Sequence, residues 1–480
     1  MFKKVFFLTF LIVINNKALA QTQIGTNING EAAGDNSGGG VALSSTGNIV
    51  AIGARFNDGN GVDSGHVRLF QNISNVWTQI GNDINGETAG NTFGWSVALS
   101  SDGSIVAVGA ANVSGYVRIY QNISGTWTQI GNEINNEMPN DGNGWSISLS
   151  NDGTIIAIGA IYNDGNGTNS GHVRIYQNVS NVWTQIGNDI DGEVTGDYSG
   201  INVSLSNDGS IVAIGAQNND ENGQDSGHVR VFQNTLGTWV QIGNDINGEA
   251  AGDNSGSSVA ISGDGNIVAV GARYNDGNAP DAGHVRIFQN ISNVWTQVGN
   301  DINGQIANDY FGTSISLSND GNTIAIGSPG NIGKVLLYKN TANNWTQMGN
   351  TINDDTDISF GGRNIALSSN GTTLANGMLF AEGNGIVSGY VKVYDLTTIL
   401  ATDSFILENS KVYPNPVKNE LHIDLEQGLT LQEVNIYSTL GQFIKKEKTN
   451  IINVSSLSKG FYFIQIVTEK GKATHKILIE

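Results

Sequence analysis

The amino-acid sequence predicts an all-β protein: a seven-bladed β-propeller of four-stranded antiparallel blades, followed by a small C-terminal β-sandwich. Two motifs support this prediction, because each recurs every 50 or 56 residues. The first, Trp-Thr-Gln-Ile-Gly and its variants, begins at Trp77, Trp127, Trp183, Trp239, Trp295 and Trp345. The second, Gly-[His/Tyr/Lys]-Val, begins at Gly65, Gly115, Gly171, Gly227, Gly283, Gly333 and Gly389. A fixed period of this length is typical of stacked or ring-closed repeat proteins.

The third unit contains four strand-like segments and no helical period. Ser146–Ser150 alternates between polar and apolar residues and runs into a hairpin turn, Asn151-Asp-Gly. Thr154–Ala160 is apolar on both faces, as expected for a strand that is covered on both sides. A polar loop leads to His172–Gln177, and a tight turn then leads to Val182–Gly187. Four antiparallel strands per unit describe a propeller blade, with the first segment innermost and the last outermost.

The two ends of the repeat region complement each other. The seventh unit has three strand segments and no following Trp-Thr-Gln-Ile-Gly copy, since Asp395-Leu-Thr-Thr stands there instead. An orphan copy, Thr22–Gly25, precedes the first unit. We therefore expect residues 21–397 to form a closed ring in which Thr22–Gly25 completes blade seven, because closure removes two exposed sheet edges. An open β-solenoid is the alternative, and it leaves the orphan segment unexplained.

The N-terminal segment and the amino-acid composition indicate where the protein is located and which partners it can bind. Lys3, Lys4, the apolar Val5–Ile14 and the small residues Ala18-Leu-Ala20 predict a secretory signal over residues 1–20. No later segment resembles a membrane span. The chain has a net charge of −20 and no Cys, so we expect neither disulfides nor thiolate metal sites. We expect no nucleic-acid partner, because the acidic repeats would repel its phosphates.

Charge also divides the chain near residue 400. Residues 21–404 contain 11 Lys and Arg against 35 Asp and Glu, whereas residues 405–480 contain 9 basic and 8 acidic residues. We expect a linker at residues 398–410 and a second domain at residues 411–480. Alternating segments such as His422–Leu425 and Phe461–Val467 predict a β-sandwich in that domain.

Every unit except the sixth has an acid in its crossing loop and a base in its third strand. The acids are Glu31, Glu87, Glu137, Glu193, Glu249 and Asp355. The bases are Arg68, Arg118, Arg174, Arg230, Arg286 and Lys392. Unit six has Gln305 and Leu336 at these two positions. Because acid and base are lost together, we predict that they form one ion pair per blade, which mainly fixes geometry.

The repeat units resemble the FG-GAP repeats of integrin α-subunit propellers. The resemblance rests on Phe93-Gly94, Phe311-Gly312 and Phe360-Gly361 before the innermost strands, and on Gly327-Ser-Pro329 and Gly109-Ala-Ala111. It covers residues 21–397. Some first hairpins of that family hold calcium in an Asp-x-Asp-x-Asp-Gly loop. The first hairpins here have one Asp in a short turn, which cannot supply the six to eight oxygens that calcium needs.

The C-terminal segment from Lys411 resembles the C-terminal sorting domain of type IX secretion, an export route of Bacteroidetes. The matching residues are Tyr413, Pro414, Asn415, Pro416, Gly441, Gly460, Tyr462 and Lys476. The resemblance implies a small immunoglobulin-like β-sandwich that the type IX secretion machinery recognises. It also implies export across the outer membrane, followed by secretion or attachment to the cell surface.

Loops between the second and third strands are a candidate calcium site. Carboxylate and amide oxygens are the ligands that calcium prefers. The candidate ligands are Asp58, Asn60, Asp63, Asp164, Asp220, Asp225, Asp276 and Asp281. The alternative is that these residues form Asx turns in solvated loops. Calcium is the cofactor that the sequence leaves open.

One repeat position varies where the rest of the unit is uniform, at the start of the innermost strand. It holds Gly39, Trp95, Trp145, Ile201, Ser257, Thr313 and Arg363. This end of the strand should lie near the central channel. Trp95 and Trp145 on neighbouring blades could form an aromatic platform for a glycan or a peptide, with Arg363 across the ring. The alternative is that these large side chains pack between blades.

Four histidines occupy one position of the third strand. They are His66, His172, His228 and His284. Because they are spread over four blades, we interpret them as scaffold rather than as one metal cluster or catalytic set.

These observations predict an exported, monomeric propeller that binds a glycan or a protein in adhesion or capture, and that is not an enzyme. The fold alone does not decide this, because one fold supports many functions. A channel-site hydrolase or lyase is one alternative, but it needs several nonrepeating polar residues at the channel, and only Arg363 qualifies. A structural surface repeat protein without a discrete ligand is the other alternative.

Overall fold

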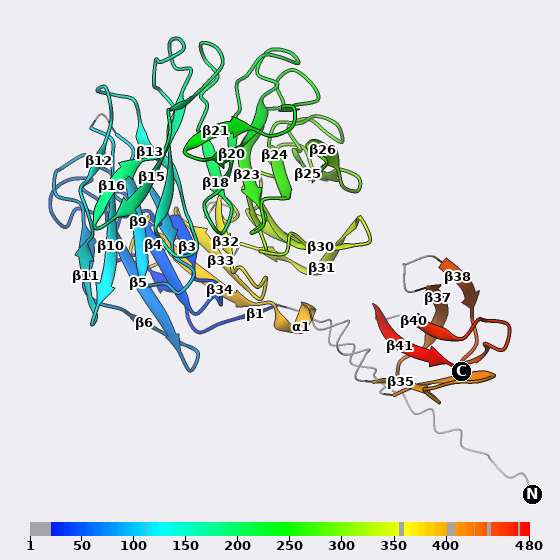
Figure 1. The fold of residues 1–480 in the computed structure, drawn as a ribbon. Helices are drawn as coiled ribbons and strands as arrows, with labels where there is room; N and C mark the ends of the chain where they lie inside the picture. Colours follow the sequence, from blue (N-terminus) through cyan, green and yellow to red (C-terminus); the bar gives the residue numbers. More distant parts are fainter. Residues whose placement is uncertain are drawn as a thin grey trace, which may run out of the picture. The chain divides into compact units, whose positions relative to one another are not determined.

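The computed structural model describes residues 21–112, 114–354, 360–400, 409–426, 428–438, 443–468 and 471–480. The chain divides into two compact units between Leu396 and Thr397. The described residues of the first unit form seven β-sheets, and those of the second unit form two (Figure 1). The described residues contain one helix, α1 (Thr397–Leu400). The expected all-β fold is confirmed.

The sheet of the third unit shows the pattern that the other units share. Its strands β13 (Asn143–Leu149), β14 (Ile155–Ala160), β15 (His172–Val179) and β16 (Val182–Gln185) pair in this order and are all antiparallel to their neighbours. This order confirms the four expected strands. A further two-residue strand, β17 (Ile190–Asp191), pairs with the first residues of β15. It was not expected, and it starts the crossing to the next sheet.

The same positions recur in the other sheets. The innermost strands are β3 (Ser37–Leu43), β8 (Ser96–Leu99), β18 (Asn202–Leu205), β23 (Ser255–Ile261), β28 (Ser314–Leu317) and β32 (Asn364–Leu367). The second strands are β4 (Ile49–Ala54), β9 (Ile105–Ala110), β19 (Ile211–Ala216), β24 (Ile267–Ala272), β29 (Thr323–Ser328) and β33 (Thr373–Met378). The third strands are β5 (His66–Ile73), β10 (Tyr116–Ile123), β20 (His228–Thr235), β25 (His284–Ile291), β30 (Lys334–Thr341) and β34 (Tyr390–Asp395).

The strands at the outer edge of most sheets are shorter than the inner ones. The outermost strands are β6 (Val76–Gln79), β11 (Thr126–Gln129), β21 (Thr238–Gln241), β26 (Val294–Gln297) and β31 (Asn344–Asn353). The two-residue strands are β7 (Ile84–Asn85), β12 (Ile134–Asn135), β22 (Ile246–Asn247) and β27 (Ile302–Asn303). In the sixth unit, β31 is long enough to occupy both positions, with a register shift between them.

The innermost strands contact one another in chain order, from β3 to β8, β13, β18, β23, β28 and β32. The last of them, β32, packs against the first, β3, so the blue and yellow ends of the repeat region lie side by side (Figure 1). We interpret the seven sheets as seven blades around a central channel, as in propellers.

Glycines allow neighbouring sheets to approach each other closely. Gly53, in a second strand, packs against Gly94, which stands before the innermost strand of the next sheet. A Cβ atom added to Gly53 would lie 2.1 Å from the carbonyl oxygen of Gly94. Gly94 itself has a φ of +91°, a conformation that other residues rarely adopt. These two constraints explain why glycine stands at both places in the repeated motif.

The N-terminal segment adds two strands to the sheet of β32–β34. Thr22 and Gln23 form β1, which pairs antiparallel with Asp395 and Tyr394 of β34. The Ile24 amide donates to the carbonyl of Val393 at 2.7 Å. Downstream, β2 (Ile28–Asn29) pairs with the start of the same strand. This sheet therefore joins the first and last segments of the repeat region.

The second unit consists of two sheets around one core. The first contains β35 (Ser410–Tyr413), β36 (Glu420–Leu425) and β39 (Ile451–Asn453). The second contains β38 (Phe443–Glu447), β37 (Leu431–Ser438), β40 (Gly460–Thr468) and β41 (Gly471–Ile479). Leu421 and Ile423 of the first sheet are buried in one cluster with Val434, Ile464 and Ile477 of the second. The two sheets therefore form a sandwich.

Candidate functional site

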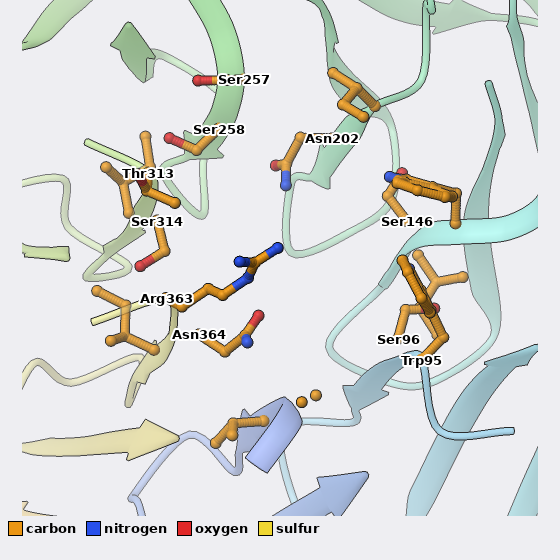
Figure 2. Close-up of a pocket in the computed structure, with 18 of the residues that line it drawn as sticks. Trp95, Ser96, Ser146, Asn202, Ser257, Ser258, Thr313, Ser314, Arg363 and Asn364 are labelled. Atoms are coloured by element: carbon orange, nitrogen blue, oxygen red, sulfur yellow. The ribbon is translucent and has the colours of Figure 1, made fainter. Parts of the chain in front are cut away.

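A cavity of about 500 Å³ lies where the innermost strands begin (Figure 2). All seven innermost strands, or the residues directly before them, contribute to its lining. The three side chains predicted from the variable repeat position, Trp95, Trp145 and Arg363, all line it. Arg363 extends into the cavity from the side opposite Trp95 (Figure 2).

The two tryptophans form one aromatic wall. Their ring centroids are 4.8 Å apart, and their planes are tilted by 47°. Tyr162 contacts Trp145 edge-to-face at 5.8 Å. Because both tryptophans are half-buried, they pack between neighbouring sheets and also present ring surface to the cavity. Packing and ligand contact are therefore compatible at this wall.

Two further arginines, Arg55 and Arg273, line the cavity and were not predicted from the sequence. The Arg55 guanidinium lies over the Trp95 ring, 4.4 Å from its centroid. Burial, followed by repulsion from Arg363, lowers the pKa of Arg55 to about 10. Desolvation and then Arg273 lower the pKa of Arg363. The three guanidinium groups thus affect one another across the cavity.

None of these three arginines forms an ion pair with a described residue, and the Nε atoms of Arg55 and Arg273 are buried without a hydrogen-bond partner. Unpaired donors facing a cavity favour an anionic ligand, because a carboxylate or sulfate can accept from the guanidinium fork.

A sequence signal for Arg55 and Arg273 does exist. Both follow the second strand directly, at a repeat position that is as variable as the one holding Trp95. In the seven units that position holds Arg55, Ala111, Ile161, Gln217, Arg273, Pro329 and Leu379. A search for every variable repeat position, rather than for those of the innermost strand alone, would have found them.

Four hydroxyl groups of the cavity form hydrogen bonds between neighbouring sheets. Ser96 donates to the carbonyl of Gly144 at 2.7 Å, and Ser146 donates to the carbonyl of Gly200 at the same distance. Ser258 and Ser314 make the equivalent bonds. The described residues that line the cavity include no Asp, Glu or His. The lining therefore suits binding of an anion better than acid–base chemistry, which needs a positioned proton-transfer group.

The candidate calcium ligands lie in exposed turns. Asp58 accepts a hydrogen bond from the Asp63 amide at 2.9 Å, and Asp220 and Asp276 accept equivalent bonds from Asp225 and Asp281. Asp164 accepts from the Asn169 amide. Asn60 donates to the Gly86 carbonyl at 3.0 Å. These aspartate bonds reach five residues along the chain. The Asx turns of the same loops are made by Asn57, Asn163, Asn219 and Asn275, each of which accepts from the amide two residues on. Calcium in these loops stays a prediction.

The described candidate sorting residues in the second unit lie on β35, the turn after it, β40 and β41. Asn415 donates to the Lys476 carbonyl at 3.0 Å and accepts from the Leu478 amide at 2.9 Å, which ties the Tyr-Pro-Asn-Pro turn to β41. The Tyr413 hydroxyl donates to Asp424, and the Tyr462 hydroxyl donates to the Ser458 carbonyl. Lys476 lies over the Phe461 ring at 4.2 Å. Gly460 begins β40, and Gly441 lies outside the described residues.

No described helix is long and apolar enough to span a bilayer. None of the curated proteins compared with the chain matches it. Two family models do match. The model of the FG-GAP repeat matches residues 135–176, 190–232 and 247–288. The model of the secretion system C-terminal sorting domain matches residues 411–480. Such a domain directs export across the outer membrane, with secretion or cell-surface attachment. The chain therefore carries FG-GAP repeats in a secreted or cell-surface β-propeller and ends in a type IX secretion sorting domain.

Proposed function

We propose that this protein binds an acidic glycan at the outer surface of the cell, through the cationic cavity at the start of the innermost strands. The observation that carries this proposal is the gathering of Arg55, Arg273 and Arg363 in one cavity, where none of them forms an ion pair with a described residue. The type IX sorting domain supports the location, because it brings the repeats to the cell exterior.

The charge distribution supports selection for an anion. Residues 21–404 contain 11 basic and 35 acidic residues. Three of those 11 basic residues line the cavity, whereas none of the acidic residues that the structure describes does. Such a concentration of one sign in a concave site focuses the electrostatic field toward a ligand of the opposite sign. A random placement of charges would put mostly acids in the cavity.

The shape and the aromatic wall favour a saccharide. A volume of about 500 Å³ lies within the roughly 300–1,000 Å³ that small-ligand sites occupy. Trp95 and Trp145 line the cavity, and the ring surface that they present to it offers apolar contact to the C–H face of a sugar ring, while Arg363 lies opposite Trp95. A saccharide with a carboxylate or sulfate group would use both sides of the cavity at once.

The two alternative functions have less support. A hydrolase or lyase in the channel would need a group that transfers a proton. Four of the lining serines instead donate to glycine carbonyls of the next sheet, and Ser257 donates to the Gly271 carbonyl of its own sheet. A purely structural repeat protein would have no need for three unpaired arginines in its channel, because a buried or crowded cation without a partner costs stability.

A glycan array probed with the full chain tests the proposal. We expect binding to saccharides that bear carboxylate or sulfate groups and little binding to their neutral counterparts. Arg363→Gln and Trp95→Ala should each weaken the signal, whereas Lys418→Gln, which removes an exposed charge in the second unit, should not. Equal binding of neutral and acidic saccharides, or capture of acidic proteins but of no saccharide, would show that the proposed ligand class is wrong.

A further inference from the structure

Each of the four third-strand histidines faces two carboxylates of its own. The groups are Glu31, His66 and Asp83; Glu137, His172 and Asp189; Glu193, His228 and Asp245; and Glu249, His284 and Asp301. In each group, one potential ligand atom from every residue lies within 4.8 Å of the others. The histidines lie on different sheets, as expected, but each brings together its own set of metal-ligand side chains.

The group around His172 shows the geometry. The His172 Nδ1 atom lies 3.9 Å from Oε2 of Glu137 and 3.6 Å from Oδ2 of Asp189. Both distances are too long for a hydrogen bond. They are close to the roughly 3.3 Å that separates two ligand atoms of a tetrahedral ion with bonds of about 2.0–2.1 Å. The three atoms therefore surround a space of the size that a small cation takes.

The imidazole nitrogen that faces this space has no partner. The His172 side chain is 1% exposed, and neither of its ring nitrogens makes a hydrogen bond with a described residue. The Nδ1 atom of His228 is buried and unpartnered in the same way. An unpaired buried polar atom is rare in proteins and requires an explanation.

Neighbouring side chains orient both carboxylates toward the histidine. The guanidinium of Arg174 lies 3.3 Å from Oε1 of Glu137, which leaves Oε2 on the histidine side. The Gln185 amide donates to Oδ1 of Asp189 at 2.6 Å, which leaves Oδ2 on that side. Polar partners that fix the direction of the ligands are a regular feature of protein metal sites.

The remaining units provide an internal comparison. Where the histidine is replaced, the aspartate is replaced too. The second unit has Tyr116 with Glu133 in place of the aspartate, the sixth has Lys334 with Gln305 and Thr351, and the seventh has Tyr390 with Asn27. In the second unit, Arg118 contacts both Glu87 and Glu133 and so takes up both carboxylates. The histidine and the aspartate of each group are thus kept or replaced together.

We propose that each of these four groups binds one zinc-type divalent transition-metal ion through one imidazole nitrogen and two carboxylate oxygens, with water as a further ligand. Imidazole and carboxylate together suit zinc, whereas calcium prefers six to eight oxygens. Two carboxylates against one guanidinium leave each group with a net charge of −1, which favours a dication. The ion would join the third strand to the crossing loops on both sides of it, so its role is to stabilise the outer part of the blades.

Zinc counting on the full chain tests this proposal. The protein is stripped with a chelator, dialysed against zinc at pH 7 and washed, and the bound metal is measured by mass spectrometry. We expect four zinc ions per chain, one for each group. Asp189→Asn and Asp245→Asn should each remove one ion, because an amide keeps the shape and the contact with glutamine but is a poor metal ligand. The fourfold variant, in which the aspartate of every group is replaced by asparagine, should bind no zinc.

Two controls separate metal binding from folding. Tyr116→Phe lies at the histidine position of a sheet that lacks the complete group, and it should retain all four ions. Circular dichroism should show the same β-sheet spectrum for the aspartate variants and the original chain. Zinc should raise the melting temperature of the original chain and of Tyr116→Phe, and it should leave that of the fourfold aspartate variant unchanged. No zinc on the original chain, or zinc that persists in the fourfold variant, would overturn the proposal.

Discussion

The third-strand arginines each connect two neighbouring sheets. Arg230 of β20 lies 3.5 Å from Glu193 and donates to the carbonyl of Asp191 at 2.6 Å, and both partners belong to the segment that leaves the preceding sheet. Its guanidinium also lies over the Phe232 ring. The acid and base pairs predicted from the sequence are confirmed at Arg68, Arg118, Arg174, Arg230 and Arg286. Asp355, the predicted acid of the seventh unit, lies outside the described residues.

A double-mutant cycle on Glu193 and Arg230 tests the energetic role of this contact. In metal-free protein, Arg230→Gln should lower the free energy of unfolding by ~2 kcal/mol, because it also removes the bond to the Asp191 carbonyl. Glu193→Gln should lower the free energy of unfolding by a smaller amount, since Glu193 is partly exposed. We expect a coupling energy of ~1 kcal/mol between the two sites, measured by urea denaturation.

The sixth unit provides the control for that cycle. Gln305 and Leu336 occupy the same two positions, so Gln305→Ala and Leu336→Ala should show a coupling energy near zero. Equal coupling energies in the fourth and sixth units would mean that the ion pair between Glu193 and Arg230 does not itself stabilise the fold.

Residue comparison within the sequence predicted these pairs because acid and base disappear together in one unit. It did not predict the metal-binding groups. The aspartate of each group stands in the loop after the outermost strand, and only the pairing of β15 with both β16 and β17 brings Asp189 beside His172. Treating the four histidines as one set also hid the fact that each has its own partners.

At the scale of elements, a chain of indole hydrogen bonds connects the outermost strands. Trp127 donates to the carbonyl of Ile80 at 2.8 Å, and Trp183, Trp239 and Trp295 repeat this bond to the preceding sheet. In the first full sheet, Trp77 donates to Ile24 at 2.9 Å, directly after β1. The N-terminal segment therefore takes the place of an outermost strand in this series of indole hydrogen bonds.

Deletion of residues 21–25 should destabilise the first unit. It removes the pairing of β1 with β34, the acceptor for Trp77 and the packing of Ile24 against the core of Val391 and Val393. We expect the free energy of unfolding to fall by ~3 kcal/mol, measured by denaturant unfolding. Gln23→Ala keeps the backbone pairing and should have little effect. If the deletion and the control were equally stable, the closing role of this segment would have to be abandoned.

The strands could be predicted from the sequence where the run of apolar or alternating residues is long enough to be recognised. Six-residue apolar strands such as β14 and the hairpin turns that follow the innermost strands are encoded locally. The strands β7, β12, β17, β22 and β27 were missed because two residues are too few to show any periodicity. Their Ile-Asn or Ile-Asp sequence becomes a strand only because the third strand extends beyond the outermost one and leaves backbone groups to pair with.

At the scale of the whole molecule, an acidic repeat region surrounds a cationic channel mouth. Trp95, Trp145 and Arg363 could be selected from the sequence because they break the repeat. Arg55 and Arg273 could not be assigned to the same site, because their positions follow the second strand and reach the channel only through the ring arrangement of the sheets. The ligand class depends on these two residues, since one arginine alone would not make the cavity an anion site.

Titration calorimetry with an acidic oligosaccharide that binds on the array tests the central claim most directly. For Arg363→Gln the account predicts an affinity about 10- to 100-fold weaker than that of the original chain, a loss of roughly 1.4–2.8 kcal/mol. Lys418→Gln should retain the original affinity, and added salt should weaken binding to the original chain more than binding to Arg363→Gln. Unchanged affinity in Arg363→Gln, or equally tight binding of the neutral form of the same oligosaccharide, would contradict the account.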